Sequence, residues 1–223
     1  MCLRRNRARS TDLSQASLRP LLVLLLGMCG CNLLTPLAFV GDYKKSVSPE
    51  YDKLAHKRVT ILVWTSPATL FDYPYARFEL ASYVGEKLKT EMAQRNLAID
   101  LVDPRDVEDH LQRELRAQAD PVAVGREFDA DCVLYLEVFE FQMRDVRQPQ
   151  LLQGRISAST TLYDLQAAGA EPARYDLTPV DCVHPEGTPA VMGPTNAPLI
   201  REQAYRKFAE QVARKFYEHS VDL

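Results

Sequence analysis

Within residues 58–219, some segments have the apolar pattern of a β-strand and others have the apolar spacing of an α-helix. The segment Arg58–Trp64 (RVTILVW) is rich in β-branched residues, which is typical of a buried strand. In Ala76–Asn96, by contrast, apolar residues recur at every fourth position, and this spacing predicts an amphipathic helix. The apolar stripe of that helix consists of Leu80, Val84, Leu88 and Met92.

Two Asp-Pro pairs mark further helix starts. The Asp side chain can cap the first turn, and proline at the first helical position loses no hydrogen bond. Asp103-Pro104 therefore predicts a helix to about Arg116, and Asp120-Pro121 predicts a short helix, PVAVGREF. Four further strands are predicted, at 97–102, 131–141, 154–165 and 174–183. A last helix is predicted from 198 to 219.

The segment 131–141 (DCVLYLEVFEF) is the most apolar run downstream of residue 40. Glu137 and Glu140 within it indicate that one face or edge of this strand is solvated. The order β-α-β-α-α-β-β-(β)-α predicts an α/β (α+β) domain at 58–223, with a single mixed sheet packed by three to four helices. The residues expected in a central strand of that sheet are Val133, Leu134, Leu136 and Val138.

The N-terminal segment has the layout of a secretory signal peptide. Five arginines and one acid precede the apolar run Leu21–Met28, which is too short to cross roughly 30 Å of hydrocarbon, a distance that takes about 20 residues. The run ends at Met28-Cys29-Gly30-Cys31, which resembles the lipobox of bacterial lipoproteins. That resemblance implies cleavage after residue 30, lipidation of Cys31, and a lipid-anchored cell-envelope protein facing the periplasm.

Alternatives remain for this segment. Cys29 is a second candidate acceptor, Leu21–Val40 is long enough for an uncleaved anchor, and the whole run could be a buried core segment. If Cys31 is the acceptor, Asn32 follows it, which by the lipoprotein sorting rule implies the outer membrane. Residues 31–57 would then be the lipidated N-terminus and a tether, because they show no sustained period.

Removal of residues 1–30 would change the charge balance. The whole chain has 27 basic and 30 acidic residues, and the part after residue 30 has 22 and 29, a net charge of −7. No basic run remains there, which argues against nucleic acid and against an anionic lipid surface as partners. Membrane attachment would therefore be through the lipid anchor.

Several phrases within 58–165 resemble a family of periplasmic lipoprotein domains, the LpoB, CsgG and TolB N-terminal type. RVTILVW, VDPRDVEDHL, GREFDADCVLYLEVFEF and ISASTTLYDL follow one another in the order seen there. Ala130-Asp131 and Leu162 with Asp164 occupy places of the family pattern, whereas Glu137 stands where that pattern has glycine. The resemblance implies a non-catalytic protein that binds other envelope proteins.

No motif for catalysis, metal or cofactor binding is present in the sequence. A G-x-S-x-G motif is missing, and no glycine-rich phosphate loop follows RVTILVW. The acids at 103–109 lie in the first turns of a predicted helix, where the dipole favours them. The cluster Asp181, Cys182 and His184 is a weak zinc signal, since a second ligand pair is missing. We therefore expect that the protein is not an enzyme and that it has no metal site and no cofactor.

Two questions stay open on the sequence alone. Phe71, Tyr73 and Tyr75 in the loop SPATLFDYPY either cover the sheet edge or form an aromatic patch that binds a protein partner. Cys132 and Cys182 either pair or stay reduced, with a buried free thiol favoured for Cys132.

The sequence predicts an accessory protein-binding lipoprotein, and the alternative is a structural or LptE-like subunit of an outer-membrane transport or secretion assembly.

Overall fold

The computed structural model describes residues 44–114, 119–145, 147–169, 171–193 and 195–222. The predicted signal peptide, the Leu21–Val40 segment and Cys31 all lie outside these residues. Within the described ranges, no helix is both long and apolar enough to cross a bilayer. Ser46–His219 form one compact unit.

A five-stranded mixed sheet forms the centre of the unit, as the sequence predicted. Its strands lie in the order β3-β2-β4-β6-β7, in which β3, β2 and β4 are parallel and β4, β6 and β7 are antiparallel. The strands are β2 (Arg58–Thr65), β3 (Asp100–Leu101), β4 (Cys132–Gln142), β6 (Gly154–Asp164) and β7 (Ala173–His184).

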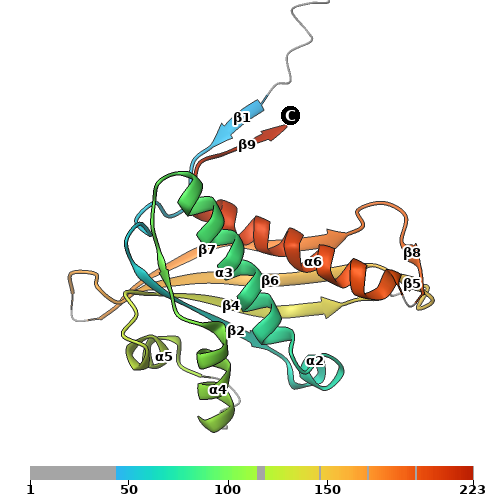
Figure 1. Cartoon of the computed structure of the whole chain (residues 1–223), viewed down its shortest axis with the longest axis horizontal. Helices are drawn as coiled ribbons and strands as arrows, with labels where there is room; N and C mark the ends of the chain where they lie inside the picture. Colours follow the sequence, from blue (N-terminus) through green and yellow to red (C-terminus); the bar gives the residue numbers. More distant parts are fainter. Residues whose placement is uncertain (1–43, 115–118, 146, 170, 194, 223) are drawn as a thin grey trace, which may run out of the picture. The chain divides into compact units, whose positions relative to one another are not determined.

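Helices cover both faces of this sheet (Figure 1). β3 and β4 lie on opposite sides of β2, so the chain moves across the sheet in one direction from β2 to β3 and in the other direction from β3 to β4. Two right-handed connections of this kind place their helices on opposite faces of the sheet. One face carries α3 and α6, and the other carries α4 and α5. Their bounds are α3 (Ala76–Gln94), α4 (Pro104–Glu114), α5 (Pro121–Glu127) and α6 (Asn196–Ala213).

The short elements were not predicted. They are two further pairs of strands, one short helix and one 3-10 turn. β1 (Lys44–Val47) pairs with β9 (His219–Asp222), and β5 (Leu151–Leu152) pairs with β8 (Ala190–Val191). The helix α2 (Pro67–Asp72) lies in the predicted loop, and α6 gives way to a 3-10 turn at Arg214–Phe216.

Leu134 and its neighbours in β4 are core residues of a central strand, as predicted. Leu134 and Leu136 are fully buried on the face covered by α3 and α6, and Val133 is fully buried on the opposite face. Glu137 points to that opposite face and is half-buried, with Trp64 of β2 and Ser159 of β6 beside it in the sheet.

The packed domain begins before residue 58. Tyr51 and Leu54, which fall in the segment expected to be a tether, are buried members of the main core cluster. The segment lacks a repeating period because these two side chains enter the core from an irregular backbone. The tether interpretation therefore does not extend to residues 51–57.

Cys132 and Cys182 are both buried and reduced. Cys132 lies opposite Asp164 on β6, whereas Cys182 lies opposite Ile156 on the same strand. Eight residues of strand separate these two positions, about 26 Å at roughly 3.3 Å per residue. A disulfide, which needs Cα atoms within about 7 Å, is therefore not possible between them.

Candidate partner-binding site

The helix α2 contributes nothing to the core. Its start is well defined, because the Ser66 hydroxyl accepts a hydrogen bond from the Thr69 N–H at 3.1 Å and Pro67 occupies the first helical turn. None of its six residues is buried, and Phe71 is 88% exposed. Folding of the domain therefore does not explain why this position carries a phenylalanine.

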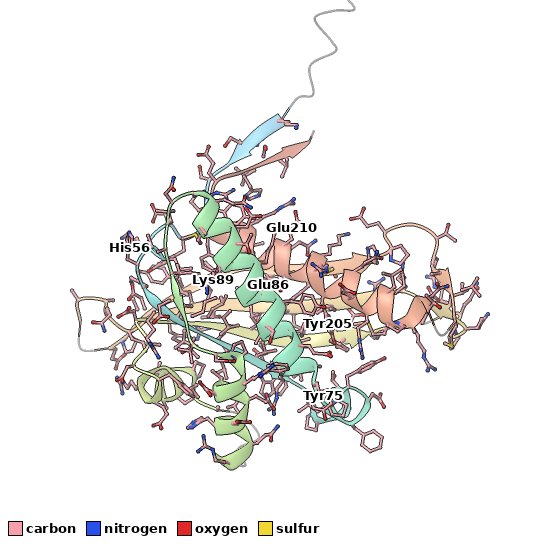
Figure 2. All side chains as sticks on the ribbon, viewed as in Figure 1. His56, Tyr75, Glu86, Lys89, Tyr205 and Glu210 are labelled. Carbon is pink, nitrogen blue, oxygen red and sulfur yellow. The ribbon has the colours of Figure 1, made fainter. Side chains whose placement is uncertain are left out.

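The structure separates the three aromatic residues that the sequence singled out. The Tyr73 ring lies 5.0 Å from the Phe141 ring, centroid to centroid, and packs against the main core. Tyr75 is 71% exposed and precedes α3, at the level of α2 (Figure 2). Tyr73 thus covers the end of β4, while Phe71 and Tyr75 are free for contact with another molecule.

A pocket of about 230 Å³ opens beside Tyr73. It lies where the end of β4, the β5–β8 pair and the first turns of α6 meet, at the same end of the sheet as α2 (Figure 1). Ala197 and Pro198, in the first turn of α6, line it. The other lining residues are Tyr73, Met143, Arg144, Leu152, Met192 and Arg201.

Two cations in this pocket have no carboxylate partner among the residues that the structure describes. Arg144 is exposed just beyond β4, and Arg201 is half-buried in α6. Within the described part of the chain, neither guanidinium lies within ion-pair distance of an acid. Burial raises the pKa of Tyr73, as does Asp72, whereas Arg144 and Arg201 act in the opposite direction.

The backbone around the pocket is closely held. Gly154 at the start of β6 leaves room for α6, since a Cβ there would lie 2.6 Å from the Ala204 Cβ and 3.5 Å from the Met143 sulfur. The Asn196 side chain donates a hydrogen bond to the Val191 carbonyl at 2.9 Å, which connects the end of β8 to the start of α6. The pocket therefore rests on the sheet and not on an isolated loop.

Exposed apolar side chains gather at the same end of the sheet. Val191 and Met192 are 69% and 41% exposed, and Leu199, next to the Ala197–Pro198 turn, is 47% exposed. Phe71 on α2 and Tyr75 next to it lie at this end of the sheet too (Figure 1), and we call these exposed residues and the pocket together the aromatic end of the sheet. Apolar surface of this kind is typical of interaction sites.

The side chains of Asp181, Cys182 and His184 do not point to a common site. Asp181 accepts a hydrogen bond from the Ser157 hydroxyl at 2.9 Å, on the sheet face opposite Cys182. The Cys182 sulfur lies 3.6 Å from the Ala204 carbonyl, and the His184 ring bonds the Gln203 side chain at 2.7 Å. Among the described residues, no group of three or more His, Cys, Asp or Glu side chains is placed to hold a metal ion.

A second polar cluster lies at the opposite end of β4, beside Cys132. The Asp164 carboxylate accepts hydrogen bonds from the Lys57 ammonium at 2.7 Å and from the Tyr51 hydroxyl at 2.9 Å. Burial raises the pKa of the neighbouring Cys132 thiol to about 11, so the thiol stays protonated near neutral pH. A protonated, fully buried thiol is a poor nucleophile, and this cluster is structural.

A larger groove, of about 350 Å³, runs between α3 and α6. Figure 2 labels two of its residues, Glu86 on α3 and Glu210 on α6. The cations along this groove are already paired within their own helices, Lys87 with Glu91 and Arg206 with Glu202. The groove therefore offers less to a charged ligand than the aromatic end of the sheet.

The arginines of the pocket were missed by sequence reasoning. Arg144 follows a strand and Arg201 lies in a helix 57 residues later, so no local pattern connects them. Only the packing of α6 on the sheet brings the two side chains to one pocket. Phe71 was singled out because it stands in a loop just after the first strand, where recognition residues are common.

No protein-family model matches the chain, and no curated protein matches its sequence. Among solved structures, it is similar to the PelC dodecamer from Paraburkholderia phytofirmans, at 10% identity and a TM-score of 0.41 over 78% of this chain and 98% of that one. It is also similar to lipoprotein GNA1162 from Neisseria meningitidis, at 14% identity and a TM-score of 0.38 over 70% and 98%.

A further similar structure is the hypothetical protein CT253 from Chlamydia trachomatis, at 12% identity and a TM-score of 0.41 over 72% of this chain and 98% of that one. Likenesses at this level carry no argument about what the chain does. The resemblance to the LpoB, CsgG and TolB N-terminal type stays a prediction.

Proposed function

We propose that this protein is a non-catalytic accessory lipoprotein of the bacterial cell envelope, which binds a protein partner through the aromatic end of its sheet. The observation that carries this proposal is the exposure of Phe71 on α2, a helix with no buried residue. An element that adds nothing to the core and displays an aromatic ring is best explained by contact with another molecule.

The surroundings of Phe71 support a polypeptide as the partner. Tyr75 and Leu199 add exposed apolar area, while Arg144 and Arg201 supply donors without carboxylate partners among the described residues. Aromatic residues and arginine are the residue types enriched at the energetically important centres of protein interfaces. All of these residues are carried by helices and turns at the end of a rigid sheet.

The proposed anchor is the lipid on Cys31, with outer-membrane delivery inferred from Asn32. In a bacterial host that processes lipoproteins, we expect Cys31→Ser to abolish labelling by a fatty-acid probe and to leave the precursor uncut. Cys29→Ser is the matched control and should be processed normally. Normal labelling and cleavage of the Cys31 variant would show that the acceptor is another residue, and a wild type that is neither labelled nor cleaved would show that the segment is an uncleaved anchor.

The partner-binding proposal is tested by capture from native membranes after crosslinking. We expect Phe71→Ser combined with Tyr75→Ser to reduce partner recovery more than tenfold, since two interface aromatics together can contribute more than about 2 kcal/mol. The matched control is Phe139→Ser, because Phe139 is 66% exposed on β4 and does not line the pocket. Equal recovery by the double variant and the control would contradict the proposal.

A further inference from the structure

We infer that the pocket beside Tyr73 binds the C-terminal residue of a partner polypeptide, with its carboxylate at the two arginines and its apolar side chain among Met143, Leu152 and Met192. This inference rests on the proposed function, because it names the part of the partner that the same end of the sheet would recognise. Its evidence is separate from the exposed rings, since it comes from the charge, lining and size of the pocket.

The charge of the pocket favours a carboxylate. Arg144 and Arg201 both lie near Tyr73, and neither has a carboxylate partner among the described residues. Arg77 and Arg206, by contrast, are paired with Glu108 and Glu202. Of the charged groups that act on Tyr73, one is an acid, Asp72 of α2, and two are arginines.

Arginine is suited to this role. A guanidinium group presents its donors in a fixed planar arrangement that matches the two oxygens of a carboxylate. Arg201 is half-buried, so a hydrogen bond to a ligand there would be screened by solvent less than an ion pair on the open surface.

The lining and size of the pocket favour a single apolar residue. Met143 and Leu152 are buried at its base, 7% and 4% exposed, and Met192 stands at its edge. Methionine side chains adapt to ligands of different shape. A volume of about 230 Å³ lies below the roughly 300–1,000 Å³ of pockets for drug-sized ligands.

A chain terminus combines both features in one residue. It carries a carboxylate and an apolar side chain on the same Cα, and the polypeptide leaves in one direction only. An internal aspartate or glutamate would need space for chain on both sides of the pocket. Capture of a C-terminal carboxylate is also a recurring way in which proteins recognise peptides.

The test is a titration of the full-length protein in detergent with short peptides, followed through the methyl signals of its methionines. The first peptide is acetyl-Gly-Ser-Gly-Leu with a free carboxylate, the second is the same peptide as a C-terminal amide, and the third is acetyl-Gly-Leu-Asp-Gly-amide. Met143 and Met192 report on the pocket. Met92, which is buried in α3, is the internal control for an intact core.

We expect the free-acid peptide to shift the Met143 and Met192 signals and to bind at least tenfold more tightly than its amide. Arg201→Gln and Arg144→Gln should each weaken binding of the free acid at least tenfold, with the Met92 signal unchanged. Arg206→Gln is the matched control, since Arg206 lies on the same helix but pairs with Glu202 outside the pocket, and it should bind normally.

Several results would overturn the inference. Equal binding of acid and amide, or no shift with either, would show that the carboxylate is not recognised. Equal binding of the internal aspartate peptide would assign the site to a side chain and not to a terminus. Displacement of the free acid by inorganic phosphate at the same concentration would reduce the pocket to a simple anion site.

Failure of this inference is distinguishable from failure of the proposed function. If the Phe71 and Tyr75 double variant loses its partner while the free-acid peptide does not bind the wild type, the surface binds a partner by other means. If partner recovery is unaffected by the double variant while the peptide binds as expected, the pocket is real and the aromatic contact is not.

Discussion

The two ends of β4 use charged and aromatic residues in opposite ways. At the start of the strand, beside Cys132, the Asp164 carboxylate is bonded to both Lys57 and Tyr51. Beyond the other end, Arg144 has no acid partner among the described residues, and Phe71 of the neighbouring α2 is 88% exposed. One end is closed by contacts within the chain, and the other is left open.

The difference separates groups that stabilise the fold from groups that remain available for binding. A buried polar group without a partner destabilises the folded state, so the Asp164 cluster has to be complete within the chain. The groups at the aromatic end are exposed or half-buried, where missing partners cost little. Their presence there is therefore better explained by a ligand than by folding.

The largest effect is expected between the two ends, at Leu134. Its side chain is fully buried in the central strand, so Leu134→Ala should lower the free energy of unfolding by about 2–5 kcal/mol through lost burial and a residual cavity. Urea unfolding monitored by circular dichroism measures this change. A stability unchanged from the wild type would mean that β4 is peripheral to the core.

Asp164→Ala should destabilise by about 3 kcal/mol, because it leaves Lys57 and Tyr51 without their shared acceptor. We take the lower part of the range for buried pairs, since the Lys57 side chain is 22% exposed. The matched control is Asp176→Ala on the adjacent strand β7, where the carboxylate is exposed and the melting temperature should not change. Equal melting temperatures for the two variants would remove the distinction between the ends.

The Asp164 cluster should also make the stability of the domain depend on pH in the acidic range. Burial raises the pKa of Asp164, but hydrogen bonds from Lys57, Tyr51 and the Gln166 N–H outweigh it and hold this pKa below its usual value. The carboxylate therefore contributes stability above the pKa of the unfolded chain, about 3.9, and loses it as pH falls through the lower folded pKa.

This dependence is measured by comparing wild type with Asp164→Asn in urea between pH 7 and pH 3. The difference in unfolding free energy should be constant from pH 7 to about pH 5 and shrink below about pH 4. A difference that stays the same at pH 3 would show that the charge of Asp164 does not contribute.

The smallest effect on stability is expected at the aromatic end. Phe71→Ser should change the free energy of unfolding by no more than about 0.5 kcal/mol, because the ring is exposed and α2 has no fully buried residue. Tyr73→Ala is the informative contrast, since its ring packs against Phe141 and should be needed for stability. A destabilised Phe71 variant would place this ring in the fold and weaken the case for binding.

Local patterns in the sequence were sufficient for most regular elements. The four-residue period of Leu80 to Met92 predicted α3, and the Asp-Pro pairs predicted the starts of α4 and α5. These features act within one or two turns of chain, so they are legible without tertiary structure. Pro67 and Pro74 predicted a loop, whereas residues 67–72 form α2.

What the sequence by itself determined is the α/β class, the buried character of β4 and the presence of unusual aromatics at 71–75. Only the tertiary structure decided which of those rings are exposed, because packing of Tyr73 on Phe141 depends on where β4 ends. It also decided that Tyr51 joins the core and that Arg144 and Arg201 share a pocket. Each of these facts joins residues far apart in the chain, and such contacts follow from the packing of whole elements, which no local period encodes.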